Sequence, residues 1–150
     1  MQIVIRKGDH SDIPKVLEEL KAFSEFYDSK YNLYKDDETS SEIIKGIMDN
    51  HLFLVALSPE DELVGFISGL IHPHLFNPDI KTLSEAFWWV KPEYRNSKAG
   101  SMLLKEYIEF GKLNADWIIC TIERHSPVND ETFLKRGFRL QEKSFLMEVH

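Results

Sequence analysis

The sequence contains very little cysteine. Cys120 is the only one among 150 residues, so no disulfide can form within the chain. We therefore expect a reducing compartment, the cytoplasm. Cys120 closes the apolar run Trp117–Cys120, where a buried structural thiol is expected rather than a nucleophile.

Long apolar runs and an excess of positive charge are also missing. No run approaches the roughly 18 apolar residues of a membrane-spanning helix, and Met1–His10 does not have the pattern of a secretory signal. The net charge of -7 at pH 7 argues against a general nucleic-acid-binding protein, which needs a basic face for the phosphates. A cationic partner such as an amine is compatible with this charge.

What remains is typical of a globular protein. Hydrophobic residues make up 43% of the chain and charged residues 29%, which are ordinary values for a folded domain. The sequence has no repeat, linker or low-complexity segment. We therefore expect residues 1–150 to form a single domain with its own core.

The first half of the chain alternates between strand and helix signals. Gln2–Arg6 alternates apolar and polar residues, as a strand does. Ser11 is the expected N-cap of a helix that has Pro14 in its first turn. Tyr27–Glu38 reads as a polar loop, and Thr39–Glu42 has the form of a capping box that opens a second helix.

The second half continues this pattern and indicates the fold class. A helix is expected after Lys98, and a short one at Asp130–Arg136 with Gly137 as its C-cap. The resulting order, β-α-α-β-β-β-α-β-α-β, predicts an α/β fold with a mixed, mostly antiparallel sheet, a βαβ unit in its C-terminal half, and helices on both faces. The expected strands are His51–Leu57, Leu63–Ile71, Ile80–Val90, Trp117–Ile122 and Phe138–Val149.

The segment Val90–Leu104 has the pattern of an anion-binding site. A strand runs into Pro92 and a polar loop, and the following helix opens with Ala99, Gly100 and Ser101. The first N–H groups of a helix lack intrahelical partners and carry partial positive charge, and small residues let a phosphate approach them. The alternative is an ordinary strand-to-helix connection.

This loop and the order of the elements resemble the GNAT family, the Gcn5-related acyl-CoA N-acyltransferases. The loop of that family has Arg or Gln, two residues, Gly, one residue, and then Gly or Ala. Arg95, Lys98 and Gly100 occupy these three places. Near the C-terminus, Asn129 and the segment Phe133–Phe138 resemble the family's last helix and its Gly-Phe ending.

The resemblance implies that acetyl-CoA is the cosubstrate. Backbone N–H groups of the loop would surround its diphosphate. The edge of the strand before the loop would pair with the pantetheine amides, and Asn129 would hold the pantetheine arm. The implied cofactor-binding residues are Trp88, Trp89, Val90, Arg95, Asn96, Ser97, Lys98, Ala99, Gly100, Ser101, Asn129 and Phe133.

Two residues depart from the family pattern. Lys98 replaces the first glycine of the loop. Phe133 stands where relatives often carry the tyrosine that protonates the leaving thiolate, and a phenyl ring cannot donate a proton. His125 could supply the acid instead, because imidazole titrates near neutral pH. Ser126 and Tyr107 are weaker candidates.

A general base is also required, because an alkylammonium must lose a proton before it can attack a thioester. Glu85 is the first candidate, since it is an acidic residue in the strand that leads to the loop. The alternative is a solvent-facing glutamate at the outer end of that strand. His125 is the second candidate and has the alternative of a plain loop histidine.

The sequence therefore predicts an N-acetyltransferase that moves an acetyl group from acetyl-CoA to a primary amine by direct attack in a ternary complex. The acceptor is a small molecule or a peptide, with neither nucleic acid nor membrane as a partner. No metal is expected, because His72 and His74 lack a third ligand. Phe133 motivates the alternative of a non-catalytic acyl-CoA sensor or partner-binding protein. A third hypothesis is an enzyme that transfers a longer acyl group. Relatives are frequently homodimers, which leaves a homodimer open here.

Overall fold

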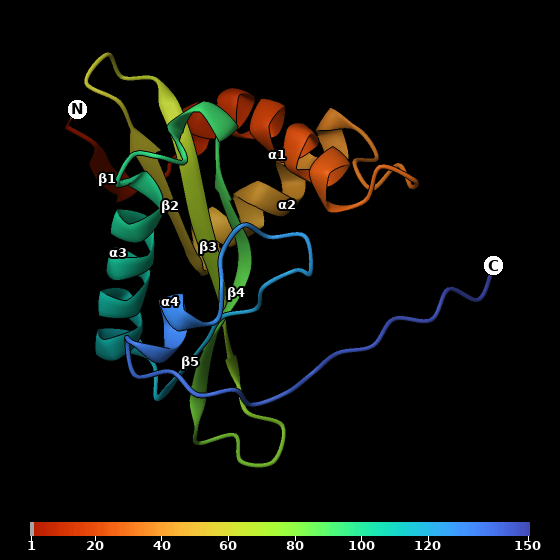
Figure 1. The fold of residues 1–150 in the computed structure, drawn as a ribbon, viewed down its shortest axis with the longest axis vertical. Helices are drawn as coiled ribbons and strands as arrows, with labels where there is room; N and C mark the ends of the chain where they lie inside the picture. Colours follow the sequence, from red (N-terminus) through yellow and green to blue (C-terminus); the bar gives the residue numbers. More distant parts are fainter. Residues whose placement is uncertain (1) are drawn as a thin grey trace.

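The computed structural model describes residues 2–150. A five-stranded sheet is combined with four α-helices and two short 3-10 helices, η1 (His10–Asp12) and η2 (Pro92–Tyr94), among these residues (Figure 1). The strands are β1 (Val4–Lys7), β2 (Leu52–Leu57), β3 (Leu63–Pro73), β4 (Lys81–Val90) and β5 (Trp117–Ile119). The helices are α1 (Ile13–Tyr27), α2 (Asp37–Asn50), α3 (Ala99–Asn114) and α4 (Glu131–Leu134).

The sheet is mixed, as the sequence predicts. Its spatial order is β1-β2-β3-β4-β5, and every pair of neighbours from β1 to β4 is antiparallel. The last pair, β4 and β5, is parallel, and α3 connects these two strands. The antiparallel meander therefore turns into a βαβ unit, which is the order expected from the hydrophobic pattern.

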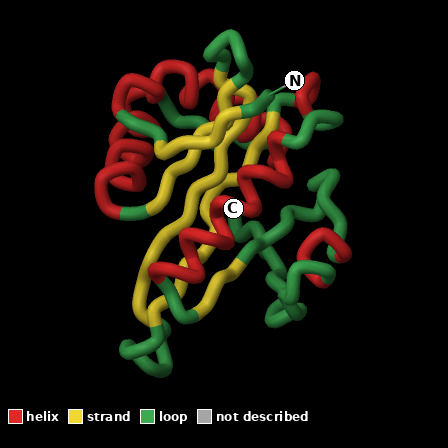
Figure 2. Tube along the Cα trace, turned by 90° about the vertical axis from the view of Figure 1, so that its left-hand side faces the viewer, coloured by secondary structure: helices red, strands yellow, loops and turns green. Residues whose placement is uncertain are grey.

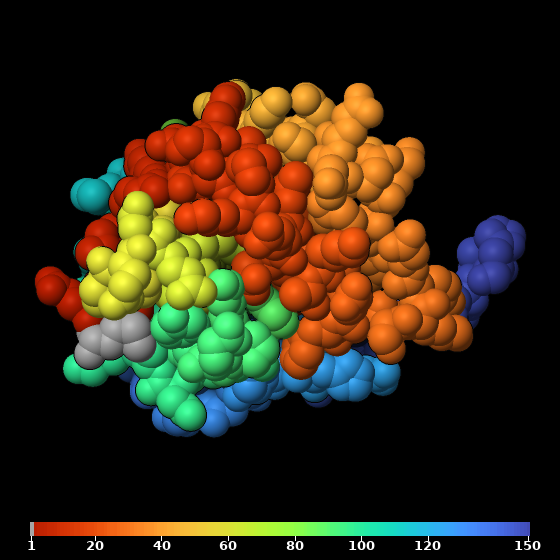
Figure 3. All heavy atoms as spheres, turned by 90° about the horizontal axis from the view of Figure 1, so that it is seen from above, coloured from red at the N-terminus to blue at the C-terminus, as the bar shows by residue number. Residues whose placement is uncertain are grey.

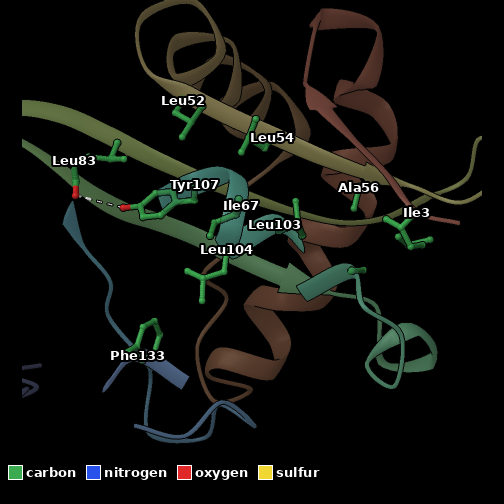
Figure 4. Packing of buried hydrophobic residues seen from close by; sticks show 12 residues of the cluster. Ile3, Leu52, Leu54, Ala56, Ile67, Leu83, Leu103, Leu104, Tyr107 and Phe133 are labelled. Carbon is green, nitrogen blue, oxygen red and sulfur yellow. Dashed lines mark hydrogen bonds between the residues drawn. The ribbon is translucent and has the colours of Figure 1, made fainter. Parts of the chain in front are cut away.

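Helices pack on both faces of the sheet (Figure 2), and each face has its own core. Along β2, Leu52, Leu54 and Ala56 join the core under α3, which includes Leu103 and Tyr107 (Figure 4). The alternate β2 residues Phe53, Val55 and Leu57 join a second core with α1 and α2. This period of two places every β2 side chain in an apolar environment, so β2 is a central strand.

Two helix starts differ from the sequence prediction. The carboxylate of Asp9, not Ser11, caps the first turn by accepting from the N–H of Ser11 at 2.9 Å, and the regular helix α1 begins at Ile13. Asp36 accepts from the N–H of Thr39 at 2.6 Å, so α2 begins ahead of the capping box predicted from Thr39. In both places an upstream aspartate supplies a charged acceptor near the positive end of the helix.

The prediction of a last strand at Phe138–Val149 is wrong. Phe138 packs edge-on against Phe133, with ring centroids 5.6 Å apart, and the chain beyond it leaves the body in an extended form without strand pairing (Figure 1). A strand needs a neighbour to satisfy its backbone groups, and within residues 2–150 this segment has none. The strand predicted at Trp117–Ile122 is likewise shorter, because β5 ends at Ile119.

Among residues 2–150, no helix combines the length and the apolar character needed to cross a membrane.

Helix α3 lies very close to the sheet at Gly111. A Cβ atom at this position would lie 2.6 Å from Cδ1 of Ile118 and 3.2 Å from Cδ2 of Leu83. Gly46 in α2 differs, because a Cβ atom there would meet nothing within 4 Å. The two glycines therefore form a matched pair for testing the contact between α3 and the sheet.

We expect Gly111→Ala to destabilise the protein by about 1–3 kcal/mol, because the added methyl group forces Ile118 and α3 apart. Gly46→Ala should stabilise it by about 0.5–1 kcal/mol, through the higher helix propensity of alanine. Urea unfolding followed by circular dichroism measures both. An equal gain in stability from the two substitutions would contradict the packing of α3 on β4 and β5.

Candidate active site

The site begins where β4 and β5 stop pairing. The last residue pair between them is Ser84 with Ile119. Beyond that pair, a cavity of about 660 Å³ is lined by Glu85, Ala86 and Trp88–Val90 from β4 and by Thr121–Glu123 after β5. Two parallel strands that separate within one sheet leave unpaired backbone between them, and such openings are common ligand sites in α/β folds.

Tyr107 fixes the position of this separation. Its side chain on α3 is fully buried, and its hydroxyl donates to the carbonyl oxygen of Ile119 at 2.8 Å. The carbonyl oxygen of Leu83 lies 3.4 Å from the same hydroxyl (Figure 4). Burial raises the pKa of this phenol above its ordinary value. Tyr107 therefore holds the two strands together at their last pair and does not line the cavity that opens beyond them.

A β-bulge in β4 orients the residues at the mouth of the separation. Ser68 pairs with Phe87 and Gly69 pairs with Glu85, so Ala86 is the extra residue. The hydroxyl of Ser68 accepts from the N–H of Phe87 at 3.1 Å. A bulge changes which face the following side chains occupy, and Phe87 accordingly packs on the α1 side of the sheet while Leu83 packs on the α3 side.

Glu85 lies in the wall of the cavity, next to this bulge. Its surroundings include Tyr107 and Cys120, whose pKa values are raised mainly by burial and further by the nearby carboxyl of Glu85. Removal from water raises the pKa of the Glu85 carboxyl to about 7, because a low-dielectric environment disfavours the charged form. A carboxyl with this pKa can both accept and release a proton at neutral pH.

The first turn of α3 forms a second part of the cavity wall. Ser97, Gly100 and Ser101 line it, and the N–H groups of Gly100 and Ser101 have no acceptor among residues 2–150. A Cβ atom at Gly100 would meet only Cγ2 of Val90, at 3.6 Å. Open space beside free N–H groups at a helix N-terminus fits a phosphate group.

Arg95 reaches from the loop into the cavity. Its guanidinium lies over the rings of Trp89, at 4.8 Å, and Phe26, at 5.3 Å. Its Nε donates to the carbonyl oxygen of Val90 at 3.1 Å. Arg95 therefore closes the side of the cavity that faces α1, in addition to bringing positive charge there.

The two adjacent tryptophans occupy opposite faces of β4, as a strand requires. Trp89 is buried, stacks on Phe23 with centroids 5.0 Å apart, and donates from Nε1 to Glu19 at 3.0 Å. Trp88 meets Phe133 edge-on at 6.1 Å. Both rings also border the cavity.

Several residues singled out in the sequence lie outside the lining. Ala99 and Phe133 are buried in the core under α3 (Figure 4). Asn129 holds the start of α4, because its Oδ1 accepts from the N–H of Thr132 at 3.3 Å. His125 is exposed and accepts from Nε of Arg124 at 3.2 Å. Asn96 and Lys98 are exposed on the loop.

The sequence reasoning missed part of the wall. The end of α1 contributes three aromatic residues, and the segments after β5 and around α4 contribute polar and cationic ones. A signal for the aromatic group existed in the sequence, since apolar residues at the end of α1 exceed what its buried stripe needs. Ser126, one of the weaker candidates for the acid, does line the cavity. The missed lining residues are Phe23, Phe26, Thr121, Ile122, Glu123, Pro127, Val128, Thr132, Lys135 and Arg136, together with Ala86 and Leu104.

Within the part of the chain that the structure describes, no group of three or more His, Cys, Asp and Glu side chains is arranged to hold a metal ion.

Comparison with known proteins identifies the family. The sequence model of the acetyltransferase (GNAT) family matches residues 15–138. The chain belongs to this family. Members of the GNAT family are acetyltransferases, and a cleft between separated strands beside a helix N-terminus is consistent with acyl transfer from acetyl-CoA. A search of curated protein sequences finds no match.

Solved structures share the whole GNAT fold. An inferred acetyl transferase from Pyrococcus furiosus superposes with a TM-score of 0.79 at 20% identity, covering 99% of this chain and 100% of that one. A GNAT family acetyltransferase from Staphylococcus aureus has a TM-score of 0.69 at 18% identity, with coverage of 99% and 100%. A predicted acetyltransferase from Clostridium acetobutylicum, solved with acetyl-CoA, has a TM-score of 0.73 at 12% identity, with coverage of 98% and 96%.

The raised pKa of Glu85 makes a prediction about stability. Because the folded state keeps a proton that the unfolded chain loses, the contribution of this group to stability falls as pH rises from about 4.5 through about 7. In Glu85→Gln the side chain at position 85 is uncharged at every pH. We therefore expect the free energy of unfolding of Glu85→Gln, relative to that of the wild type, to increase between pH 5 and pH 8 by about 2 kcal/mol, after allowance for residual contact with water.

Urea unfolding at a series of pH values measures this difference. Glu106→Gln is the matched control, because Glu106 is exposed on α3, and its difference from the wild type should stay nearly constant with pH. A constant difference for Glu85→Gln as well would show that the carboxyl is not desolvated.

Proposed function

We propose that this protein transfers an acetyl group from acetyl-CoA to a primary amine by direct attack within a ternary complex. The observation that carries the proposal is the placement of Glu85, whose pKa is about 7, in the cleft where β4 and β5 separate. The same cleft is bordered by the N-terminus of α3. A proton acceptor and an anion site thus border one cavity. The single cysteine further supports a cytoplasmic location.

The residues present fit acetyl-CoA. The free N–H groups of Gly100 and Ser101 would bind its diphosphate. Lys135 and Arg136 border the same cavity. Their positive charges favour an anionic ligand there, although the whole chain has a net charge of -7. Among residues 2–150, the cleft-facing edge of β4 beyond Ser84 has no partner strand, so its backbone groups are available to the amides of the pantetheine arm. When bound, acetyl-CoA supplies the activated acetyl group as a thioester.

Glu85 is proposed as the general base. An alkylammonium has a pKa near 10.4 and cannot attack a carbonyl group until it loses a proton. A carboxylate with a pKa of about 7 accepts that proton directly or through water and matches the operating pH well. A backbone N–H at the Val90 end of β4 is proposed to stabilise the oxyanion that forms on attack.

The leaving thiolate needs no phenol at position 133. A thiol has a pKa near 8.5, so the thiolate can depart and take a proton from solvent. Phe133 instead packs against Trp88 and Phe138 and supports the β4 side of the cleft. The hydroxyl groups of Tyr27 and Ser126 lie on residues that line the cavity, whereas His125 does not line it.

The wall toward α1 indicates the kind of acceptor. Phe23, Phe26 and Tyr27 border the cavity there, and Arg95 covers the ring of Phe26. Aromatic rings around one entrance favour an amine carried on an apolar stem, because they bury its carbon atoms. We therefore propose a small molecule or a peptide of this kind as the acceptor.

A second function, binding of acyl-CoA without turnover, is favoured by one observation. Phe133 removes the family's usual acid. A transcriptional regulator from Bacillus halodurans shares the fold, with a TM-score of 0.75 at 18% identity, covering 99% of this chain and 100% of that one. If this chain binds acyl-CoA without turnover, it would bind acetyl-CoA and release no CoA with any amine.

Release of CoA in the presence of a panel of primary amines tests the proposal. We expect Glu85→Gln to lower kcat by about 10²–10⁴-fold and to leave the Kd of acetyl-CoA within about threefold. For the wild type, the rate should rise with pH through an apparent pKa near 7, and this rise should be absent from Glu85→Gln.

Glu106→Gln again serves as the control and should keep the wild-type kcat. Unchanged turnover of Glu85→Gln would remove Glu85 from the role of base. Binding of acetyl-CoA without CoA release from any amine would replace the transferase proposal with that of a binding protein.

A further inference from the structure

Arg95 carries a positive charge that no neighbouring carboxylate pairs with among residues 2–150. Its Nε donates to the carbonyl oxygen of Val90 at 3.1 Å, whereas its two terminal nitrogens have no hydrogen-bond acceptor in the same range of residues. Arg95 also lines the cavity. A guanidinium group presents its donors in a fixed plane and can pair with two oxygens of one carboxylate or phosphate. An unpaired guanidinium in a cavity wall therefore suits an oxyanion of the ligand.

Aromatic rings hold this guanidinium in place. Its central carbon, Cζ, lies 4.8 Å from the ring centroid of Trp89 and 5.3 Å from that of Phe26. The ring of Trp89 is held in turn, because it stacks on Phe23 at 5.0 Å and its Nε1 donates to Glu19 at 3.0 Å. A side chain that packing already orients loses little conformational entropy when an oxyanion binds. The group is therefore preorganised.

The guanidinium lies apart from the proposed diphosphate site. Trp89 belongs to the core that the sheet forms with α1 and α2, and Phe26 is a residue of α1. The free N–H groups of Gly100 and Ser101 begin α3, which packs on the opposite face of the sheet. Figure 3 shows the end of α1, in orange, beside the green loop that precedes α3. This placement favours an oxyanion of the acceptor over the diphosphate as the partner of Arg95.

The spacing along β4 limits the length of such an acceptor. Four residue steps separate Glu85 from Trp89, which at about 3.3 Å each amounts to about 13 Å, or somewhat less across the bulge. An amine near Glu85 and an oxyanion near Arg95 are thus separated by on the order of 10 Å. In an α-amino acid the amine and the carboxylate share one carbon atom and are too close together. A peptide of about three residues, at about 3.3–3.6 Å per residue, or a long ω-amino acid has the required length.

We propose that the acceptor is a primary amine with a carboxylate at the other end of an apolar stem, and that Arg95 binds this carboxylate through both terminal nitrogens. The identity of the amine rests on the proposed acetyltransferase function, whereas the carboxylate site does not depend on turnover. The rings of Phe23, Phe26 and Tyr27 border the cavity and would bury the stem. Glu85 favours the orientation with the amine at its own end of the cleft, because two carboxylates repel each other.

Calorimetric titration, with and without CoA, tests the site in the absence of any transfer. The probes are ω-aminooctanoate and its carboxamide, which differ in charge but hardly in length. We expect the wild type to bind the carboxylate at least about tenfold more tightly than the carboxamide. In Arg95→Gln the two affinities should agree within about threefold.

Two further variants complete the design. Arg139→Gln is the matched control, because Arg139 is exposed and lies outside the cavity lining, and it should keep the preference of the wild type for the carboxylate. Arg95→Lys keeps the charge but not the planar group, so its preference should lie between those of the wild type and Arg95→Gln. A preference in Arg95→Lys equal to that of the wild type would overturn the two-nitrogen contact.

Release of CoA from acetyl-CoA separates this proposal from the transferase proposal. For the wild type, ω-aminooctanoate should have a kcat/KM at least about tenfold above that of its carboxamide and above that of free leucine, which is too short. The preference over the carboxamide should disappear in Arg95→Gln. A carboxylate preference in binding without any CoA release would support the site and contradict the transferase function.

Three results would overturn the carboxylate site. The first is equal affinity of the wild type for the two probes, and the second is a preference that persists in Arg95→Gln. The third is a loss of CoA affinity in Arg95→Gln that exceeds the loss of affinity for ω-aminooctanoate, because Arg95 would then bind a phosphate of the cofactor.

Discussion

The hydrogen bond from Tyr107 to the carbonyl oxygen of Ile119 is the contact on which the site depends. It lies at the last residue pair of the parallel strands β4 and β5. On one side of it the strands are paired and packed under α3, with the close contact at Gly111. On the other side they separate, and the space between them becomes the cavity. A buried hydroxyl that satisfies a carbonyl group at the end of a ladder costs little and fixes where the ladder ends.

The same boundary determines the electrostatics of Glu85. This residue follows the last paired residue of β4 directly, at the bulge, and its carboxyl lies near Tyr107 of α3 and is largely removed from water. Placing an acidic group there makes the fold less stable at neutral pH than a neutral residue would. A cost in stability at a position that borders a cavity is typical of active sites, where chemistry rather than packing selects the residue.

Much of this arrangement could be predicted from the sequence. The hydrophobic periods predict the strands, the helices and the mixed sheet, and the small residues Gly100 and Ser101 lie, as expected, in an open first turn of α3, where they border the cavity. The helix starts at Asp9 and Asp36 could not be separated from the nearby serines and threonines, because both kinds of residue can cap a helix. The aromatic wall at Phe23 and Phe26 depends on how α1 crosses the sheet, which is a tertiary property. The strand predicted at Phe138–Val149 shows the limit most clearly: its pattern is that of a strand, but within residues 2–150 it has no neighbouring strand to complete it.

The central claim is that the cleft beside the first turn of α3 binds acetyl-CoA through free N–H groups. Calorimetric titration with acetyl-CoA tests it most directly, on the wild type and on the pair Ser101→Asp and Ser101→Asn, which differ in charge but hardly in size. Ser101 lines the cavity and is exposed. The account predicts one acetyl-CoA bound per chain, with affinity lowered at least about tenfold by Ser101→Asp and far less by Ser101→Asn. No binding up to millimolar acetyl-CoA, or equal affinities for the two variants, would contradict it.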